Sequence, residues 1–278
     1  MKNKFGLIGL GSMGSMIINQ VVEQGIYDEK DIYVAELSGD KLAKLKCKYN
    51  SINICDNKEV VQNCSNVMIC VLPAIVPRVL SEIVPYVKEE INIMISTAVV
   101  SYRDLYKIYP GGITKFMPTL NSTVRGGVTL VCYNEQVPEE NKKYFAELMS
   151  YMSEVVEIRE EDMNLCHNLN GSFPAYISEL MLEFVKSAYS RSAGVSFDKI
   201  ERIVALSLEG SSRLFKEKNM KFEDMKNTVS TKGSITYEGI KVYEDVLPDM
   251  FDKAFDAAMK KYSYMSEEVS ESIEFSIK

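Results

Sequence analysis

A glycine-rich turn close to the amino terminus limits the folds open to this chain more than any other feature. Residues 5–14 read Phe-Gly-Leu-Ile-Gly-Leu-Gly-Ser-Met-Gly, so a short apolar strand leads into Gly9-x-Gly11-x-x-Gly14, and residues 15–22 then have helical character. Glycines at these positions permit a tight turn, close approach of the backbone to a pyrophosphate, and close packing of helix on strand. The turn therefore predicts a dinucleotide-binding domain of the Rossmann type.

The segment after this turn indicates which dinucleotide is bound. A second apolar strand, residues 31–35, ends in Glu36, which follows Gly14 by 22 residues. A carboxylate at this position binds the ribose 2′-hydroxyl of NAD and repels the 2′-phosphate of NADP. We therefore expect an NAD(P)H site in which NADH is favoured.

Apolar strand-like segments alternate with helical segments through the first part of the chain. Such alternation is typical of a doubly wound, mostly parallel sheet covered by helices on both faces. We therefore predict a Rossmann-like α/β domain over residues 1–161. The expected strands are residues 4–8, 31–35, 67–71, 92–96, 114–117, 128–132 and 155–158.

After Glu161 the strand signal disappears, and residues 162–278 are predicted to form an all-α domain. Its helices carry apolar residues on more than one side and need a partner surface, so we expect a homodimer or larger homo-oligomer formed through them. The polar, acidic end of the chain is expected to fray. The helices are expected to start near Pro174, Ser196 and Ser234, with an interruption of the last one at Pro248 and fraying from Ser263 onward.

Composition argues against nucleic-acid-binding, membrane-spanning and metal-binding proteins. The net charge of −7 gives no basic footprint for nucleic acid. No apolar run approaches the ~20 residues needed to span a bilayer, and glycines interrupt the apolar part of residues 1–20, unlike a signal peptide. The six cysteines show no CxxC pairing and no histidine at ligand spacing, so we expect reduced core residues and no metal site. These features favour a cytoplasmic protein that binds neither nucleic acid nor membrane.

The turn that precedes the last helix is a second candidate site. Gly233 relaxes the backbone just before Ser234, the predicted N-cap. Unpaired N–H groups at such a helix start, together with the helix dipole, form a seat for a small anion such as a carboxylate. Thr236 adds a hydroxyl beside this seat. Taken alone, this arrangement of residues is more often an ordinary capped helix start than an anion-binding site.

Several short motifs follow one another along the chain. They are the glycine turn, Asn57-Lys-Glu-Val-Val-Gln62, Val71-x-Pro73, Ser96-x-Ala98, Met117-Pro118, Gly171-Ser-Phe-Pro-Ala-Tyr176 and Ser230-Thr-Lys-Gly-Ser-Ile-Thr-Tyr-Glu-Gly-Ile240. In this order and spacing they resemble the motifs of the pyrroline-5-carboxylate reductase family over essentially the whole length. The last one is similar to the family signature Ser/Thr-Ser/Thr-Pro-Gly-Gly-x-Thr-x-x-Gly/Ala-Leu.

The resemblance implies an enzyme that transfers hydride from NAD(P)H to the C=N bond of 1-pyrroline-5-carboxylate, a small cyclic imino acid, giving L-proline. It implies that the Thr236 hydroxyl is catalytic and addresses the ring nitrogen, and that the N–H groups of Ile235 and Thr236 hold the carboxylate. The other substrate-binding residues that it implies are Thr228, Thr231, Gly233, Ser234 and Glu160. The cofactor contacts that it implies are Gly9, Leu10, Gly11, Ser12, Met13, Gly14, Glu36, Asn57, Val71, Leu72, Pro73 and Ala98.

Several positions depart from the family pattern and make the chain similar to the late-competence ComER-type branch of the family. In place of residues usual in the family, the chain has Leu37 for the arginine after the second strand, Leu72 for the lysine of Val-Lys-Pro, Thr119 for the asparagine of Met-Pro-Asn, Lys232 for the proline of Pro-Gly-Gly, and the bulky Ile235 before the key threonine.

Alternatives therefore stay open beside a working reductase. One is a catalytically weak paralogue that binds dinucleotide and has a regulatory role. Another is a β-hydroxyacid dehydrogenase, suggested by the glycine turn but disfavoured because Gly171-Ser-Phe-Pro-Ala175 lacks the expected lysine. His167, the only histidine, stands where the reductase family usually has threonine. It either approaches the substrate pocket or, more commonly for an isolated histidine, makes a structural hydrogen bond.

Overall fold

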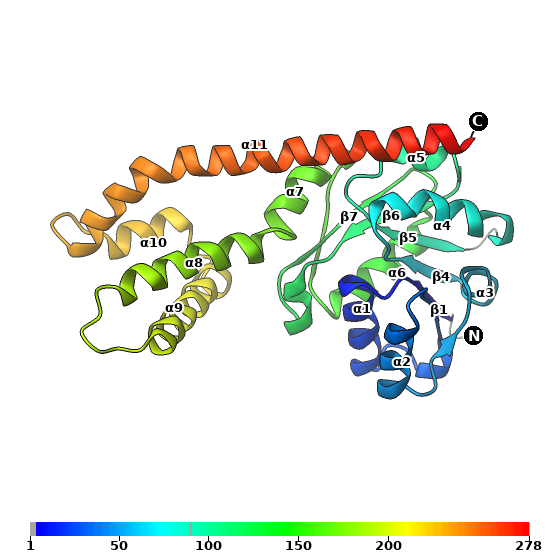
Figure 1. Cartoon of the computed structure of the whole chain (residues 1–278), viewed down its shortest axis with the longest axis horizontal. Coiled ribbons are helices and arrows are strands. Elements are labelled where there is room, and N and C mark those ends of the chain that lie inside the picture. Colours follow the sequence, from blue (N-terminus) through cyan, green and yellow to red (C-terminus); the bar gives the residue numbers. More distant parts are fainter. Residues whose placement is uncertain (1–3, 89–90, 278) are drawn as a thin grey trace. The chain divides into compact units, whose positions relative to one another are not determined.

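Short apolar strands separated by helices form one eight-stranded sheet in the computed structural model, which describes residues 4–88 and 91–277 (Figure 1). The strand order is β3-β2-β1-β4-β5-β6-β7-β8, and all neighbours pair in parallel except β6 and β7, which are antiparallel. The predicted doubly wound, mostly parallel sheet is thus confirmed. The strands are β1 (Phe5–Ile8), β2 (Ile32–Ala35), β3 (Asn53–Ile54), β4 (Asn66–Ile69), β5 (Asn92–Ser96), β6 (Ile113–Met117), β7 (Val128–Tyr133) and β8 (Glu154–Glu157).

Helices cover both faces of this sheet because successive strand residues point to opposite sides. Leu7 and Met68 lie in the core beneath α1, α2 and α6, whereas Ile8, Val67 and Ile69 lie in the core beneath α3, α4, α5 and α7. Strands buried on both faces read as nearly continuous apolar runs, which is why they were recognisable from sequence. The helices are α1 (Ser12–Glu23), α2 (Gly39–Lys48), α3 (Asn57–Asn63), α4 (Val76–Ile83), α5 (Tyr102–Tyr106), α6 (Glu139–Ser150) and α7 (Met163–Asn170).

The order of the strands reverses at β1. This strand pairs with β2 on one side and with β4 on the other, both in parallel. The loops that leave the carboxyl ends of β1 and β4 therefore diverge and open a crevice, the usual ligand site of such sheets. The glycine turn follows β1 directly and lies at this position.

The chain divides into two units: Met1–Ser172 together with Met259–Lys278, and Phe173–Ala258. The second unit, all of whose residues the structure describes, consists of α8 (Phe173–Tyr189), α9 (Phe197–Glu217), α10 (Phe222–Val229) and the first part of α11 (Ile235–Ile277). This agrees with the predicted all-α region. Val185 is its one buried apolar side chain, and large apolar residues such as Phe184, Leu206 and Phe222 are exposed. So much uncovered apolar surface is typical of an interaction face.

Two expectations about the last helix, an interruption at Pro248 and fraying from Ser263 onward, are wrong. Helix α11 continues through Pro248 without interruption, although proline lacks the N–H that would bond to the preceding turn. Its end does not fray from Ser263 onward, because Val269 and Ile273 are buried in the core of the first unit. In the described residues, no helix combines the length and the apolarity needed to cross a membrane.

Hydrogen bonds fix the end of α11 as well. The Ser270 hydroxyl donates to Asp104 Oδ2 at 2.6 Å, and the Ser266 hydroxyl donates to the carbonyl oxygen of Val99 at 2.9 Å. Asp104 lies on α5, and Val99 lies in the loop after β5. Polar residues that led to the prediction of a frayed tail therefore bind other residues of the first unit.

Candidate functional site

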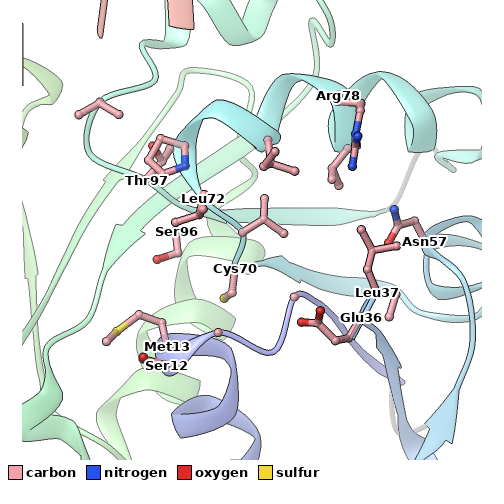
Figure 2. Close-up of a pocket in the computed structure, with 18 of the residues that line it drawn as sticks. Ser12, Met13, Glu36, Leu37, Asn57, Cys70, Leu72, Arg78, Ser96 and Thr97 are labelled. Atoms are coloured by element: carbon pink, nitrogen blue, oxygen red, sulfur yellow. The ribbon is translucent and has the colours of Figure 1, made fainter. Parts of the chain in front are cut away.

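A pocket of about 780 Å³ lies at the carboxyl ends of the central strands, and residues of the first unit line it entirely. Loops after β1, β2, β3, β4 and β5 and the end of β6 contribute to its walls, together with α4, α7 and the later part of α11. Figure 2 shows the glycine turn with Ser12 and Met13 at one side, and Ser96, the last residue of β5, with Thr97 after it opposite. The pocket thus occupies the crevice that the strand order creates.

The glycine turn forms the floor of this pocket. Gly9 has a φ of +100°, and a Cβ there would lie 2.6 Å from the carbonyl oxygen of Cys70. A Cβ on Gly14 would lie 2.0 Å from the carbonyl oxygen of Gly9, so α1 packs directly on the turn. By contrast, the nearest atom to a Cβ on Gly11 is 4.0 Å away, which leaves room above it.

The start of α1 suits a pyrophosphate. Gly11 is the N-cap, no side chain caps the helix, and its first turn carries no acidic residue. The free N–H groups and the positive end of the helix dipole therefore face the space above the turn. The residues present fit a dinucleotide at this point.

Glu36 is held at the end of β2 by backbone groups. Its Oε2 accepts from the N–H of Leu10 at 2.7 Å, and its Oε1 accepts from the N–H of Ser38 at 2.9 Å. Burial raises the pKa of the Glu36 carboxyl, but these hydrogen bonds and the charge of Lys41 outweigh burial and keep the pKa below its ordinary value. An ionised carboxylate therefore faces this end of the pocket, and the neighbouring Leu37 is 89% exposed.

Arg78 also lines the end of the pocket where Leu37 and Asn57 lie, and it was not predicted from the sequence. Figure 2 shows its side chain extending from α4 toward Leu37 and Asn57. Asn57 donates from Nδ2 to Glu82 Oε2 at 3.0 Å and so is fixed at this wall. The signal available in the sequence was the position of Arg78 in the first turn of the helix that follows the Val71–Pro73 loop.

The opposite end of the pocket lies beyond the β4 loop. Its walls come from the end of β5, the end of β6, α7 and α11. His167 Nδ1 and the Tyr262 hydroxyl form a hydrogen bond here, and their rings meet edge to face with centroids 5.8 Å apart. Burial lowers the pKa of the His167 imidazole. His167 thus makes the structural hydrogen bond that is more common for an isolated histidine, and it also lines the pocket.

The residues predicted to contact the cofactor gather at this pocket, with two of them just behind its wall. Leu10 is buried and donates its N–H to Glu36, and Gly14 lies beneath Gly9. Those that line the pocket are Gly9, Gly11, Ser12, Met13, Glu36, Asn57, Val71, Leu72, Pro73 and Ala98.

Glu160, predicted at the substrate, lies in the first unit but outside the lining of the pocket. Its Oε1 accepts from Lys115 Nζ at 2.7 Å and from the N–H of Tyr102 at 2.7 Å. Lys115 is only 1% exposed, so its charge needs this partner. In this chain Glu160 balances a buried lysine.

The other predicted substrate residues lie in the second unit, around the start of α11. Ser234 caps this helix by accepting from the N–H of Tyr237 at 3.1 Å, and Gly233 has a φ of +89°, so the predicted cap and relaxed backbone are confirmed. The N–H groups of Ile235 and Thr236 occupy the first two helical positions, which have no intrahelical acceptor. Ile235 is 93% exposed.

Two remaining residues of this set have local roles. The Thr228 hydroxyl donates to the carbonyl oxygen of Asp224 at 2.7 Å within α10, and the carbonyl oxygen of Thr231 accepts from the N–H of Ser234 at 2.9 Å. Thr231 thereby closes the turn that leads into α11, and Ser234 caps that helix. Among residues 4–88 and 91–277, no group of three or more His, Cys, Asp or Glu side chains is placed to hold a metal ion.

Known proteins share this architecture. The family described as pyrroline-5-carboxylate reductase dimerisation matches residues 160–265, and the family described as NADP oxidoreductase, coenzyme F420-dependent, matches residues 4–99. Pyrroline-5-carboxylate reductase 3 of Bacillus subtilis is 31% identical over 96% of this chain and 98% of its own length. ComE operon protein 4 of the same organism is 26% identical over 93% and 95%, respectively. A solved pyrroline-5-carboxylate reductase from Coxiella burnetii has a TM-score of 0.85 at 26% identity and covers 95% of this chain and 99% of its own.

Proposed function

The chain belongs to the pyrroline-5-carboxylate reductase family, and from this premise we propose that it reduces the C=N bond of 1-pyrroline-5-carboxylate to give L-proline, with NAD(P)H as the reductant. One observation carries the proposal. The similarity to the Bacillus subtilis reductase spans 96% of the chain and therefore includes both the glycine-turn pocket and the capped start of α11. The β-hydroxyacid dehydrogenase alternative rested on the glycine turn alone.

The residues divide the work between holding the cofactor and holding the substrate. When bound, the nicotinamide supplies the hydride. The start of α1 holds the pyrophosphate and Glu36 holds the adenosine ribose. The N–H groups of Ile235 and Thr236 hold the substrate carboxylate, and the Thr236 hydroxyl stabilises the ring nitrogen while its proton arrives from solvent. An iminium is already electrophilic, so alignment supplies most of the acceleration.

We further propose that NADH is preferred over NADPH. The ionised Glu36 carboxylate at the end of β2 would repel the 2′-phosphate of NADP, and Leu37 stands where the family usually has an arginine, although Arg78 lines the same end of the pocket. Comparison of kcat/KM for NADH and NADPH at limiting concentration tests this preference. Equal values would contradict it.

The working form that we propose is a cytoplasmic homodimer or larger homo-oligomer that acts on a small cyclic imino acid. The dimerisation family that matches residues 160–265 and the exposed apolar side chains of the second unit support the assembly. The start of this match also supports the predicted division of labour, with dinucleotide binding by residues 1–161 and substrate binding and dimerisation by residues 162–278.

A direct test starts from the product side. Purified protein should reduce NAD when L-proline or thioproline is supplied at alkaline pH, as seen in the absorbance of the reduced nicotinamide. NADH binding without turnover in either direction would instead support the catalytically weak, regulatory paralogue. That alternative draws on the similarity to ComE operon protein 4 and on Leu72, which is 74% exposed where the family motif has lysine.

A further inference from the structure

The His167–Tyr262 pair joins two elements that are far apart in the sequence, inside the same pocket. His167 lies on α7 and Tyr262 on α11, and both line the cavity near the ends of β5 and β6. The hydrogen bond between Nδ1 and the hydroxyl fixes the orientation of both rings. The two hydrogen-bonded side chains therefore form a defined part of the pocket wall.

The surrounding contacts hold each partner in place. A Cβ on Gly171 would lie 2.4 Å from His167 Nε2, so the absence of a side chain at Gly171 makes room for the imidazole. Asn170 donates to the carbonyl oxygen of Val128 at 2.9 Å and ties the end of α7 to β7. On the other side, the Ser266 hydroxyl bonds to the Val99 carbonyl one turn beyond Tyr262. These contacts hold the two helices that carry the rings against the rest of the first unit.

The position of the pair in the pocket indicates which half of a dinucleotide it meets. Glu36 and Arg78 mark the adenosine end, and the glycine turn lies in the middle. In a doubly wound sheet the dinucleotide crosses the switch point, so its second half reaches the strands beyond β4. His167 and Tyr262 stand at that far end.

We propose that His167 and Tyr262 are positioning residues for the nicotinamide half of the cofactor, which their hydrogen-bonded rings contact at the far end of the pocket. This inference rests on the proposed function only in assuming that the pocket binds a dinucleotide. Burial favours the neutral imidazole, and a neutral ring does not repel the cationic nicotinamide of the oxidised cofactor. The pair is thus compatible with both redox forms.

The resemblance places threonine at the position of His167 in most family members, so the pair distinguishes this chain from the usual pattern. A threonine side chain is too short to replace the imidazole as a wall. We therefore expect the nicotinamide contact made here to depend on both rings.

The test measures binding alone, by calorimetry, with three probes: NADH, NAD and ADP-ribose, which lacks only the nicotinamide. Tyr262→Phe removes one hydroxyl and breaks the pair, and Tyr264→Phe is the matched control because Tyr264 lies on the same helix with 53% of its surface exposed. We expect Tyr262→Phe to weaken NADH and NAD about three- to tenfold, to leave ADP-ribose unchanged, and to reduce the fluorescence enhancement of bound NADH. The control should change none of these.

His167→Ala provides a second variant and should give the same pattern. Equal weakening of ADP-ribose and NADH would mean that the pair only tethers α11, and no weakening of either would mean that it does not contact the cofactor; each result overturns the proposal. Wild-type protein that binds ADP-ribose and NADH but does not turn over pyrroline-5-carboxylate would leave this inference standing and remove the proposed activity. Wild-type protein that binds none of the probes would remove both.

Discussion

Glu36 Oε2 accepts a hydrogen bond from the N–H of Leu10 at 2.7 Å, so the end of β2 is joined to the glycine turn after β1. The carboxylate therefore stabilises the turn and faces the adenosine end of the pocket with one group. Substitution at Glu36 is therefore expected to change cofactor binding.

Glu36→Gln removes the charge and keeps only one of the two oxygens that accept from the N–H groups of Leu10 and Ser38. We expect the Kd of NADH to rise about tenfold, since a hydrogen bond to a charged group contributes about 1.5–3 kcal/mol, while the Kd of NADPH stays constant or falls. Calorimetric titrations with both cofactors check this. Asp40→Asn, on the exposed face of α2, is the charge-matched control. A loss of NADPH affinity as large as that of NADH would show that Glu36 does not discriminate between them.

Thr236→Ala removes the hydroxyl proposed to stabilise the ring nitrogen. Turnover should fall about 100-fold or more, because a donor that acts in the transition state is lost, while NADH affinity changes little. Thr236→Ser retains the hydroxyl and should restore most of the turnover. An unchanged kcat in the alanine variant rejects the assigned role.

Asp104→Asn should loosen the end of α11. Burial raises the pKa of Asp104, but hydrogen bonds from Ser270, Lys107 and Ser101 outweigh burial and lower the pKa below its ordinary 3.8. A lowered carboxyl pKa stabilises the fold above pH 3.8, and this contribution is lost as the pH falls through the lower folded value. We expect a loss of about 1–3 kcal/mol in the free energy of unfolding at neutral pH. The difference from wild type should shrink below pH 3.8.

Chemical denaturation across this pH range measures the effect. Asp249→Asn is the matched control, because Asp249 pairs with Lys253 on the exposed surface of the same helix and should change stability by less than about 0.5 kcal/mol. A loss that is equal in the two variants, or that grows as the pH falls, would contradict the assigned role of Asp104.

The cysteines should differ in reactivity toward iodoacetamide. Burial raises the pKa of Cys70 to about 12 and, with the nearby Glu59 and Asp56, that of Cys55 to about 11. Cys47 is exposed, contrary to the core position expected from sequence. At pH 8 we therefore expect rapid labelling of Cys47 and little labelling of Cys55 or Cys70, as followed by peptide mass spectrometry. Labelling of Cys70 at the rate of Cys47 would show that the floor of the pocket is open to reagents.

Much of the fold was readable because its signals are local. The strands around β1 and β4 are continuous apolar runs, and the capped start of α11 follows from Gly233 and Ser234 in sequence. Strand β3 was missed because two residues, Asn53 and Ile54, form no period. Only the structure shows that this short segment pairs with β2.

The end of α11 was missed for a different reason. Met265, Val269 and Ile273 recur every four residues, which is a helical stripe, but the polar composition around them was given more weight. Arg78 and Tyr262 were missed because they reach the pocket from helices that the motifs do not include. Composition predicts exposure on average, whereas tertiary contacts decide which residues form a site.

The most direct test of the central claim is a crystal structure of the assembled protein with NADH and L-proline. We predict the dinucleotide along the glycine turn, with adenosine at Glu36, and the proline carboxylate within hydrogen-bond distance of the N–H groups of Ile235 and Thr236. A dinucleotide outside the glycine-turn pocket, or a proline carboxylate bound away from that helix start, would contradict the account.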